Sequence, residues 1–224
     1  MTKIPILFCT DGIHPHQVGG IQRHSRLLIE ELVAQGEVDI TVIHPHEERV
    51  FPEELGVKEI QLQGIDTSKN YLRECHSYSK RVYEVAVAHP NHVIYSQGLC
   101  IWHGIADIAD RVIVNPHGLE PYQALSTKEK LVAIPFKKVF DRIFNKAGHV
   151  ISLGGGLTTI LESRIRQKEK IVVLPNATVL PESTHNHNWP DVNQPIRLLF
   201  VSRFAANKGI HILMEAIEQL NASG

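Results

Sequence analysis

The chain has 224 residues, of which 43% are apolar and 21% charged, and its formal net charge at pH 7 is -1. This length suits one large domain or two small ones, and the balanced charge gives no general electrostatic reason to bind nucleic acid. No run approaches the roughly 18 apolar residues of a membrane span, and the N-terminus lacks the apolar core of a signal peptide.

The cysteines indicate a reducing environment. Cys9, Cys75 and Cys100 are odd in number, widely spaced and outside any CxxC pattern. We therefore expect three reduced thiols and a cytoplasmic protein.

Short β-branched runs alternate with segments of helical period. The runs lack strict polar alternation, which is typical of strands covered on both faces. Seven strands are predicted, at Ile4–Phe8, Val38–Ile43, Val57–Leu62, His92–Tyr95, Arg111–Asn115, His149–Ser152 and Ile171–Leu174. Helices are predicted at Gln22–Ala34, Tyr71–Ala88 and Phe136–Lys146. This alternation predicts an α/β fold with a doubly wound parallel sheet and helices on both faces.

A change in composition marks a domain boundary. Residues 182–195, which follow Pro181, are polar, rich in Pro and Asn, and without an apolar period, so they are predicted to be a linker. We expect a first domain over 1–181, and over 196–224 the first strand and helix of a second, truncated domain, too short to bury a core of its own. An unpaired edge strand at Leu198–Val201 would favour a homodimer.

The first candidate site is Gly19–Gly20, which follows the first strand and opens the first helix. Ligands of doubly wound sheets bind at the carboxyl ends of strands, and glycines without a Cβ let backbone amides approach an anion at a helix N-terminus. A plain turn is the alternative explanation. The dinucleotide fingerprint GxGxxG is absent, which disfavours a dehydrogenase.

His117 is the second candidate, because it follows the fifth predicted strand in the sequence PHG. A histidine there can face the central cleft and bond to a substrate hydroxyl or phosphate. With 14 histidines in the chain, an ordinary loop histidine is favoured on position alone.

Arg203 and Lys208 form the third candidate, in the sequence VSRFAANKG between the last predicted strand and the last helix. Arginine offers a planar fork for phosphate oxygens and lysine a point charge. A solvated basic loop explains the two cations equally well.

Two further patterns are interpreted as surface features. Three His-x-His pieces, at His14–His16, His44–His46 and His185–His187, lack the carboxylate or cysteine partners of a metal site, so solvent-exposed histidines are favoured and no metal is expected. The basic side of Phe136–Lys146, made by Lys137, Lys138, Arg142 and Lys146, is better explained as a solvated face than as a peripheral contact with the inner face of a membrane.

Taken together, these motifs resemble the family-4-type glycosyltransferases of the GT-B fold. Gly-Gly before the first helix, PHG after a mid-chain strand, VVLPNATVL before the linker and VSR…KG with a helix after it occur in the family's order. The resemblance spans essentially the whole chain, and VSR…KG is its most specific part. Two departures are Ala177 and Ser202, where the family pattern has glycine.

The resemblance implies a retaining transferase with two Rossmann-like domains, an acceptor side and a donor-binding side. The donor would be a nucleotide diphosphate sugar and the acceptor a glycan or lipid-linked molecule, with no metal cofactor. Arg203 and Lys208 match the cations that hold the diphosphate. Gly19 and Gly20 match the loop that approaches donor sugar and phosphate, and His117 matches the cleft histidine of the catalytic site.

The resemblance also implies that the second domain is incomplete. The family's Glu-x7-Glu motif is not reached before Gly224, so we expect a glycosyltransferase whose 224-residue piece is weakly active or inactive alone. Polysaccharide biosynthesis follows from the family only. A GT-B sugar-nucleotide epimerase and a non-catalytic binding or assembly module remain open alternatives.

Overall fold

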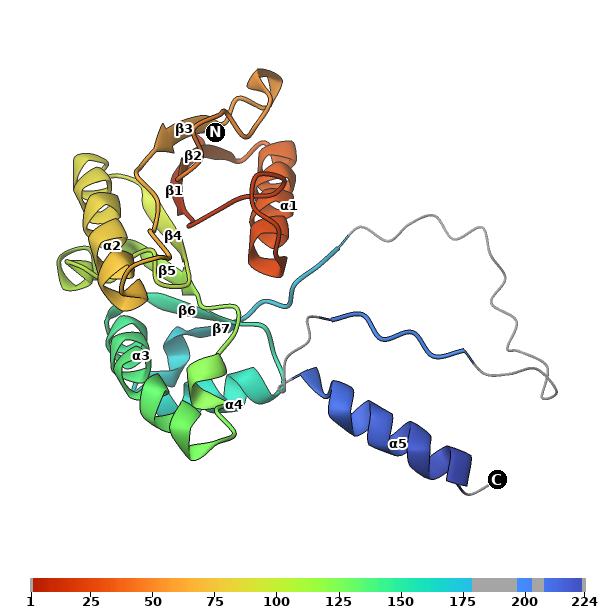
Figure 1. The fold of residues 1–224 in the computed structure, drawn as a ribbon. Helices are drawn as coiled ribbons and strands as arrows, with labels where there is room; N and C mark the ends of the chain where they lie inside the picture. The colour runs from red at the N-terminus through yellow and green to blue at the C-terminus, as the bar shows by residue number, and fades with distance from the viewer. Residues whose placement is uncertain (1, 179–196, 203–207, 223–224) are drawn as a thin grey trace. The chain divides into compact units, whose positions relative to one another are not determined.

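The computed structural model describes residues 2–178, 197–202 and 208–222 (Figure 1). The chain divides into two compact units, Met1–Thr178 and Val179–Gly224.

The first unit is built on one parallel sheet, shown in Figure 1. The strand order is β3-β2-β1-β4-β5-β6-β7, and every neighbouring pair is parallel. The strands are β1 (Ile4–Cys9), β2 (Val38–His44), β3 (Lys58–Gln61), β4 (Val93–Gln97), β5 (Val112–Asn115), β6 (His149–Ser152) and β7 (Ile171–Val173). All seven predicted strands are present, with ends shifted by at most two residues. The order reverses beside β1, which creates the switch point where such sheets bind ligands.

The sheet buries both of its faces. Successive strand residues point to opposite sides, so Leu7 of β1 packs in one apolar cluster and Phe8 in the other. The Leu7 cluster takes Tyr78 from helix α2 (Tyr71–Ala88) and Phe144 from helix α3 (Thr127–Lys146). The Phe8 cluster takes Ile29 from helix α1 (Gly20–Gln35). Figure 1 shows α1 and α2 on opposite sides of the strands. The doubly wound α/β fold is therefore confirmed for this unit.

Local signals in the sequence explain where the helices start and stop. Gly36 ends α1 with φ of 76°, in the left-handed region that favours glycine, and its N–H bonds to the carbonyl of Val33. Asn70 caps α2 by accepting a bond from the N–H of Arg73 at 3.0 Å.

The apolar pattern predicts that this helix begins at Phe136. In the structure, helix α3 begins at Thr127. Ser126 and Glu129 form a capping box, in which each side chain bonds to the other's backbone N–H, and this box starts the helix early. Pro135 lies inside the helix and interrupts the pattern. Helix α4 (Gly156–Arg164) was not predicted, because its short sequence has little apolar periodicity.

The second unit contains helix α5 (Ile210–Ala222) among its described residues. The predicted strand there is wrong for residues 197–202, none of which is in a strand. A strand needs a neighbour for its ladder of hydrogen bonds, and the described part of this unit offers a single helix beside the segment. The homodimer expected from an unpaired edge at this segment stays a prediction. The predicted linker lies outside the described residues, and the assignment of this unit to a second Rossmann-like domain stays a prediction.

Among the described residues, no helix has both the length and the apolar character needed to cross a bilayer.

Candidate functional site at the carboxyl edge of the sheet

The carboxyl ends of the central strands present the polar groups of the candidate site. β1, β4 and β5 are parallel neighbours, so their final residues lie along one edge. Gln97 ends β4 and pairs in register with Asn115, which ends β5. Both side chains are buried, at 1% exposure, and both form a hydrogen bond with His117.

His117 sits in an unusual backbone conformation just after β5. Its φ is 55°, and it is the one non-glycine residue with positive φ in the described chain. The Asn115 side chain stabilises this turn, since its Oδ1 accepts the N–H of His117 at 3.0 Å. Asn115 Nδ2 in turn donates to the hydroxyl of Tyr95 at 3.0 Å. Such strain costs free energy and persists where surrounding contacts hold it, often at functional sites.

Two neighbouring elements fix the His117 ring. Its Nε2 is hydrogen-bonded to Oε1 of Gln97 from β4. The ring of His24, in the second turn of α1, meets it edge-on with 5.0 Å between the centroids. His117 therefore links β4, β5 and the beginning of α1 at a single point.

Both histidines are neutral near pH 7. Burial is the main cause that lowers the pKa of His117 to about 3, with a smaller contribution from the neighbouring His24. Burial also lowers the pKa of His24. A neutral imidazole can donate one hydrogen bond and accept another. With this pKa, His117 is a weak base, so it suits orientation of a hydroxyl better than proton abstraction.

Two buried nitrogen atoms close to His117 have no hydrogen-bond partner, Nε2 of His24 and Nε2 of Gln97. Orphaned buried polar atoms are uncommon and mark places where a ligand or an ordered water completes the bonding.

Gly19 and Gly20 differ in what a side chain would meet. Gly19 caps α1 with φ of 169°, which is extended backbone, and a Cβ there would come within 2.1 Å of Oε1 of Gln22. A Cβ on Gly20 would have no atom within 4 Å. The space over Gly20 is open, so a ligand could approach the first amides of α1 at this point.

Gly20→Ala therefore separates folding from ligand approach. Alanine is the better helix former, so we expect the free energy of unfolding to stay the same or rise by up to about 1 kcal/mol. The resemblance of the motifs implies a donor at this point, so its turnover is expected to fall about 10-fold, the usual cost of a misfitted methyl group. Urea unfolding and a transfer assay check the two parts. A decrease in the free energy of unfolding would contradict open space at Gly20.

The loop before Gly19 is anchored at its start by α2. The hydroxyl of Tyr78, a fully buried residue, donates to the carbonyl of Thr10 at 2.6 Å. We expect Tyr78→Phe to lower the free energy of unfolding by about 1–2 kcal/mol, because it leaves a buried carbonyl unpaired. The matched control is Tyr83→Phe, whose hydroxyl bonds to Asp107 at an exposed position. Urea unfolding of both variants is the measurement, and equal losses would argue against a special role for the buried bond.

The histidine pairs of the first unit make contacts within the protein. His44 and His46 bond to protein atoms, and His16 stacks on His46 with 5.0 Å between the centroids. The prediction that these histidines are solvent-exposed is wrong for His44, whose side chain is buried at the end of β2, a strand with a neighbour on each side. Among residues 2–178, 197–202 and 208–222, no group of three or more His, Cys, Asp or Glu is arranged to hold a metal ion. His185–His187 lies outside the described residues.

The predicted diphosphate site belongs to the second unit. Lys208 is exposed and lies one residue before Gly209, whose φ of 74° makes the turn into α5. Arg203 lies outside the described residues. The roles of both cations stay predictions.

Sequence reasoning missed His24, Gln97 and Asn115. Each contacts or supports His117, and His24 and Asn115 lie on predicted elements. Gln97 is two residues beyond the predicted end of its strand. Their positions in the sequence could have identified Gln97 and Asn115, because polar residues at the ends of adjacent parallel strands lie along one edge of the sheet.

The fold is a doubly wound α/β fold with its switch point beside β1, and the sequence comparison gives the family. The family model for Glycosyltransferase Family 4 matches residues 18–180. The chain belongs to this family. No curated protein matches the sequence.

Solved structures share the fold at low sequence identity. Sucrose-phosphate synthase from Thermosynechococcus elongatus has a TM-score of 0.59 and 17% identity, over 77% of this chain and 48% of that one. WaaG, a glycosyltransferase involved in lipopolysaccharide biosynthesis, has a TM-score of 0.54 and 15% identity, over 76% and 44%. A protein assigned as a UDP-N-acetylglucosamine 2-epimerase from Listeria monocytogenes has a TM-score of 0.52 and 14% identity, over 76% and 45%. The chain thus spans about half the length of these neighbours.

Proposed function

We propose that this protein is part of a retaining, nucleotide-sugar-dependent glycosyltransferase that transfers a sugar to a glycan or lipid-linked acceptor. The observation that carries the proposal is the strained, buried and neutral His117 beside the start of α1, at the carboxyl edge of a family-4 domain.

The proposed roles follow from the chemistry of each group. The backbone amides at the start of α1, which no side chain covers at Gly20, would face the donor's anionic or hydroxyl oxygens. The neutral His117 would hydrogen-bond a sugar hydroxyl and hold it in place. Arg203 and Lys208 would stabilise charge on the departing nucleoside diphosphate, which makes a metal unnecessary.

A surface cavity at the start of α2 suits an acceptor-side role. It has a volume of about 570 Å³ and is lined by Lys69, Asn70, Arg73, Glu74 and Ser77. Helix α2 follows β3, so its first turn lies towards the same carboxyl edge as His117. Its mixed charges and hydroxyl suit a polar acceptor such as a glycan.

The test is release of nucleoside diphosphate from a panel of UDP-, GDP- and ADP-sugars, with glycan and lipid-linked acceptors added in turn. The 224-residue chain is compared with an extended form that carries a complete second domain of the family. We expect acceptor-dependent release with retained anomeric configuration in the product, and weak or no turnover by the 224-residue chain alone. Inversion of configuration would contradict the retaining mechanism.

A sugar-nucleotide epimerase is a second candidate, favoured by the structural likeness to the Listeria protein. It would change the configuration of the donor sugar without an acceptor, which the same assay detects by analysing the recovered donor. Saturable glycan binding without turnover of any donor by either form would favour a non-catalytic module.

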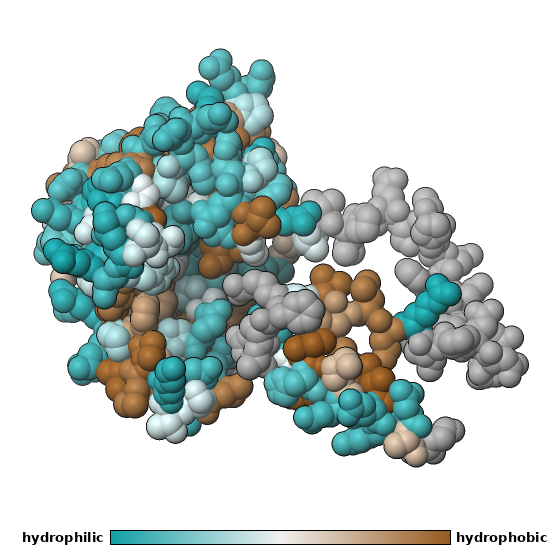
Figure 2. Space-filling model, viewed as in Figure 1, coloured by the Kyte–Doolittle hydropathy of each residue, from teal (hydrophilic) through white to brown (hydrophobic). Residues whose placement is uncertain are grey.

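A peripheral membrane contact through α3 extends the proposal to lipid-linked acceptors. Leu131 and Val132 are exposed at 64% and 62%, next to Lys128 and Lys130 on the same helix. Figure 2 shows hydrophobic side chains among hydrophilic ones on the face that carries α3. Apolar side chains bordered by lysines suit an anionic lipid surface.

Sedimentation with phosphatidylcholine vesicles, with and without about 30% phosphatidylglycerol, tests this contact. We expect binding to the anionic vesicles alone, and weaker binding for Leu131→Ser with Val132→Ser. Equal sedimentation with both kinds of vesicle would contradict the contact.

A further inference from the structure

A chain of hydrogen bonds connects β3 to the loop that leads to Gly20. It begins at Glu59 of β3, whose side chain is 9% exposed. The Glu59 carboxylate accepts the N–H groups of Val50 at 2.8 Å and Phe51 at 2.9 Å. Burial alone would raise the pKa of Glu59, but these two bonds and the His44 ring lower it below its ordinary value. Glu59 is therefore ionised near pH 7 and can only accept.

This fixes the tautomer of His44, which ends β2. Its Nε2 lies 2.8 Å from the Glu59 carboxylate and must carry the proton that it donates. Its Nδ1 accepts the backbone N–H of His46 at 3.2 Å, so this nitrogen carries none. His44 is thus neutral, and it holds the backbone of His46 in place.

His46 connects His44 to the loop between β1 and α1. Its Nε2 accepts the backbone N–H of Ile13 at 2.8 Å. A nitrogen that accepts carries no proton, so His46 is also neutral in this arrangement. Burial, and then the nearby His44 and His16, lower the pKa of His46 to about 4, in agreement with the bonding.

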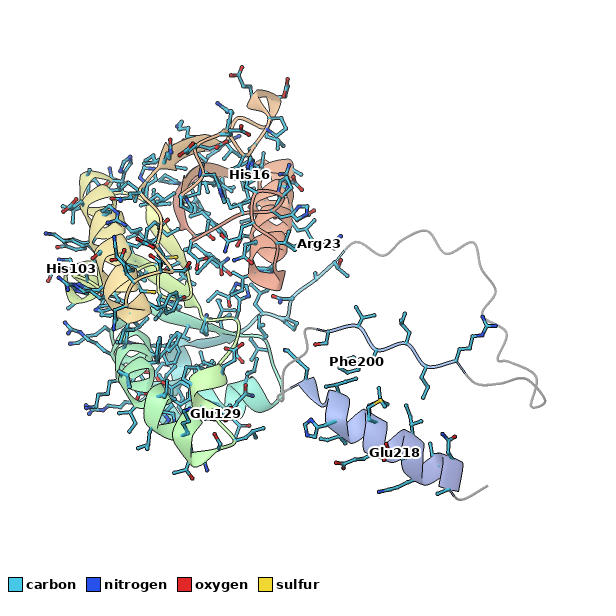
Figure 3. The ribbon with its side chains drawn as sticks, in the orientation of Figure 1. His16, Arg23, His103, Glu129, Phe200 and Glu218 are labelled. Atoms are coloured by element: carbon cyan, nitrogen blue, oxygen red, sulfur yellow. The ribbon has the colours of Figure 1, made fainter. Side chains whose placement is uncertain are left out.

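Ile13 lies midway along the loop between β1 and α1, and its side chain is fully buried. Gln17, two residues before Gly19, donates its N–H to the carbonyl of Ile13 at 3.0 Å. Arg26 of α1 holds the next residue, by donating to the carbonyl of His14 at 3.1 Å. The position of Ile13 therefore determines how the loop enters α1. Figure 3 labels His16 in this loop and Arg23 on the first turn of the helix.

We propose that His46, oriented by the Glu59–His44 pair, is a positioning residue that holds the loop between β1 and α1 in the conformation that presents Gly19 and Gly20 to the donor. This inference rests on the proposed glycosyltransferase function. His46 itself acts through Ile13 and has no assigned contact with substrate.

The test compares His46→Leu, which removes the acceptor, with His46→Gln, which keeps an acceptor oxygen at the end of a side chain of similar length. His16→Leu is the control, because it removes an exposed ring from the same cluster and leaves the bond to Ile13 intact. Hydrogen exchange of the Ile13 amide is followed by NMR. We expect His46→Leu to speed this exchange about 10-fold, the effect of one lost hydrogen bond, with recovery in His46→Gln and no change in His16→Leu.

Turnover in the extended form separates this inference from the proposed function. If His46 positions the donor loop, kcat/KM falls in His46→Leu and recovers in His46→Gln. Faster exchange with unchanged turnover would overturn the positioning role and leave the glycosyltransferase function standing. Unchanged exchange in His46→Leu would overturn the inference outright. Should His46→Leu not fold, the ¹⁵N resonances of wild-type His46 decide, since a protonated Nε2 contradicts the bond to Ile13.

Discussion

Arg203→Ala is expected to reduce sugar transfer about 10²–10³-fold, and Lys208→Ala by a similar or smaller factor, the range for losing one group that stabilises charge in a transition state. In the proposed reaction, the leaving nucleoside diphosphate gains negative charge as the sugar departs. A cation placed there stabilises that developing charge more than the charge of the bound donor, so kcat should fall more than KM changes. Steady-state kinetics on the form of the protein that shows turnover give kcat and KM.

Arg197→Ala is the matched control, because Arg197 is an exposed cation on the same segment without a role in the family's pattern. It should leave kcat unchanged. Equal, modest losses in all three variants at low salt, disappearing at high salt, would indicate a general attraction for the donor and contradict specific diphosphate contacts.

The stability of the first unit should fall as the pH is lowered from 7 to 5, because His117 is buried and neutral. The unfolded chain binds a proton at its ordinary histidine pKa, whereas the pKa of folded His117 is lowered to about 3. Below the unfolded value the unfolded state binds more protons, so the free energy of unfolding decreases with falling pH. His117 alone should cost about 2 kcal/mol at pH 5 relative to pH 7.5. His24, His44 and His46, whose pKa values are also lowered, act in the same direction.

Urea unfolding at pH 7.5, 6 and 5 measures this loss. His117→Asn removes the titrating ring and keeps a residue type that tolerates positive φ. Its free energy of unfolding should depend less steeply on pH than that of the wild type. Parallel pH curves for the two proteins would show that His117 is not buried in its neutral form.

The strands were predictable because the central strands are buried on both faces, so most strands are β-branched apolar runs that turns or helices interrupt, although β3 is largely polar. The start of helix α3 and the existence of helix α4 were not predictable from the apolar pattern. Helix α3 starts at a capping box before Pro135, and α4 is too short to show a period. Residues 197–202 have strand-like composition, but composition supplies no partner strand.

The site was predictable only in part. His117 and Gly20 follow strand ends that the pattern locates, and the structure brings α1 to His117 through His24. The contact of Gln97 with His117 joins residues 20 positions apart, and the bond from Ile13 to His46 joins residues 33 apart. Such contacts depend on strand order and side-chain direction, which periodicity does not encode.

We propose that sugar transfer takes place at the carboxyl edge around His117. The most direct measurement is kcat/KM for the preferred donor in wild type, His117→Asn and His149→Asn. His149 is an exposed histidine at the start of β6, on the amino edge of the same sheet. We expect a loss of about 10²-fold in His117→Asn, typical of removing a well-placed side chain from a reacting group, and none in His149→Asn. Full activity in a folded His117→Asn protein would contradict this proposal.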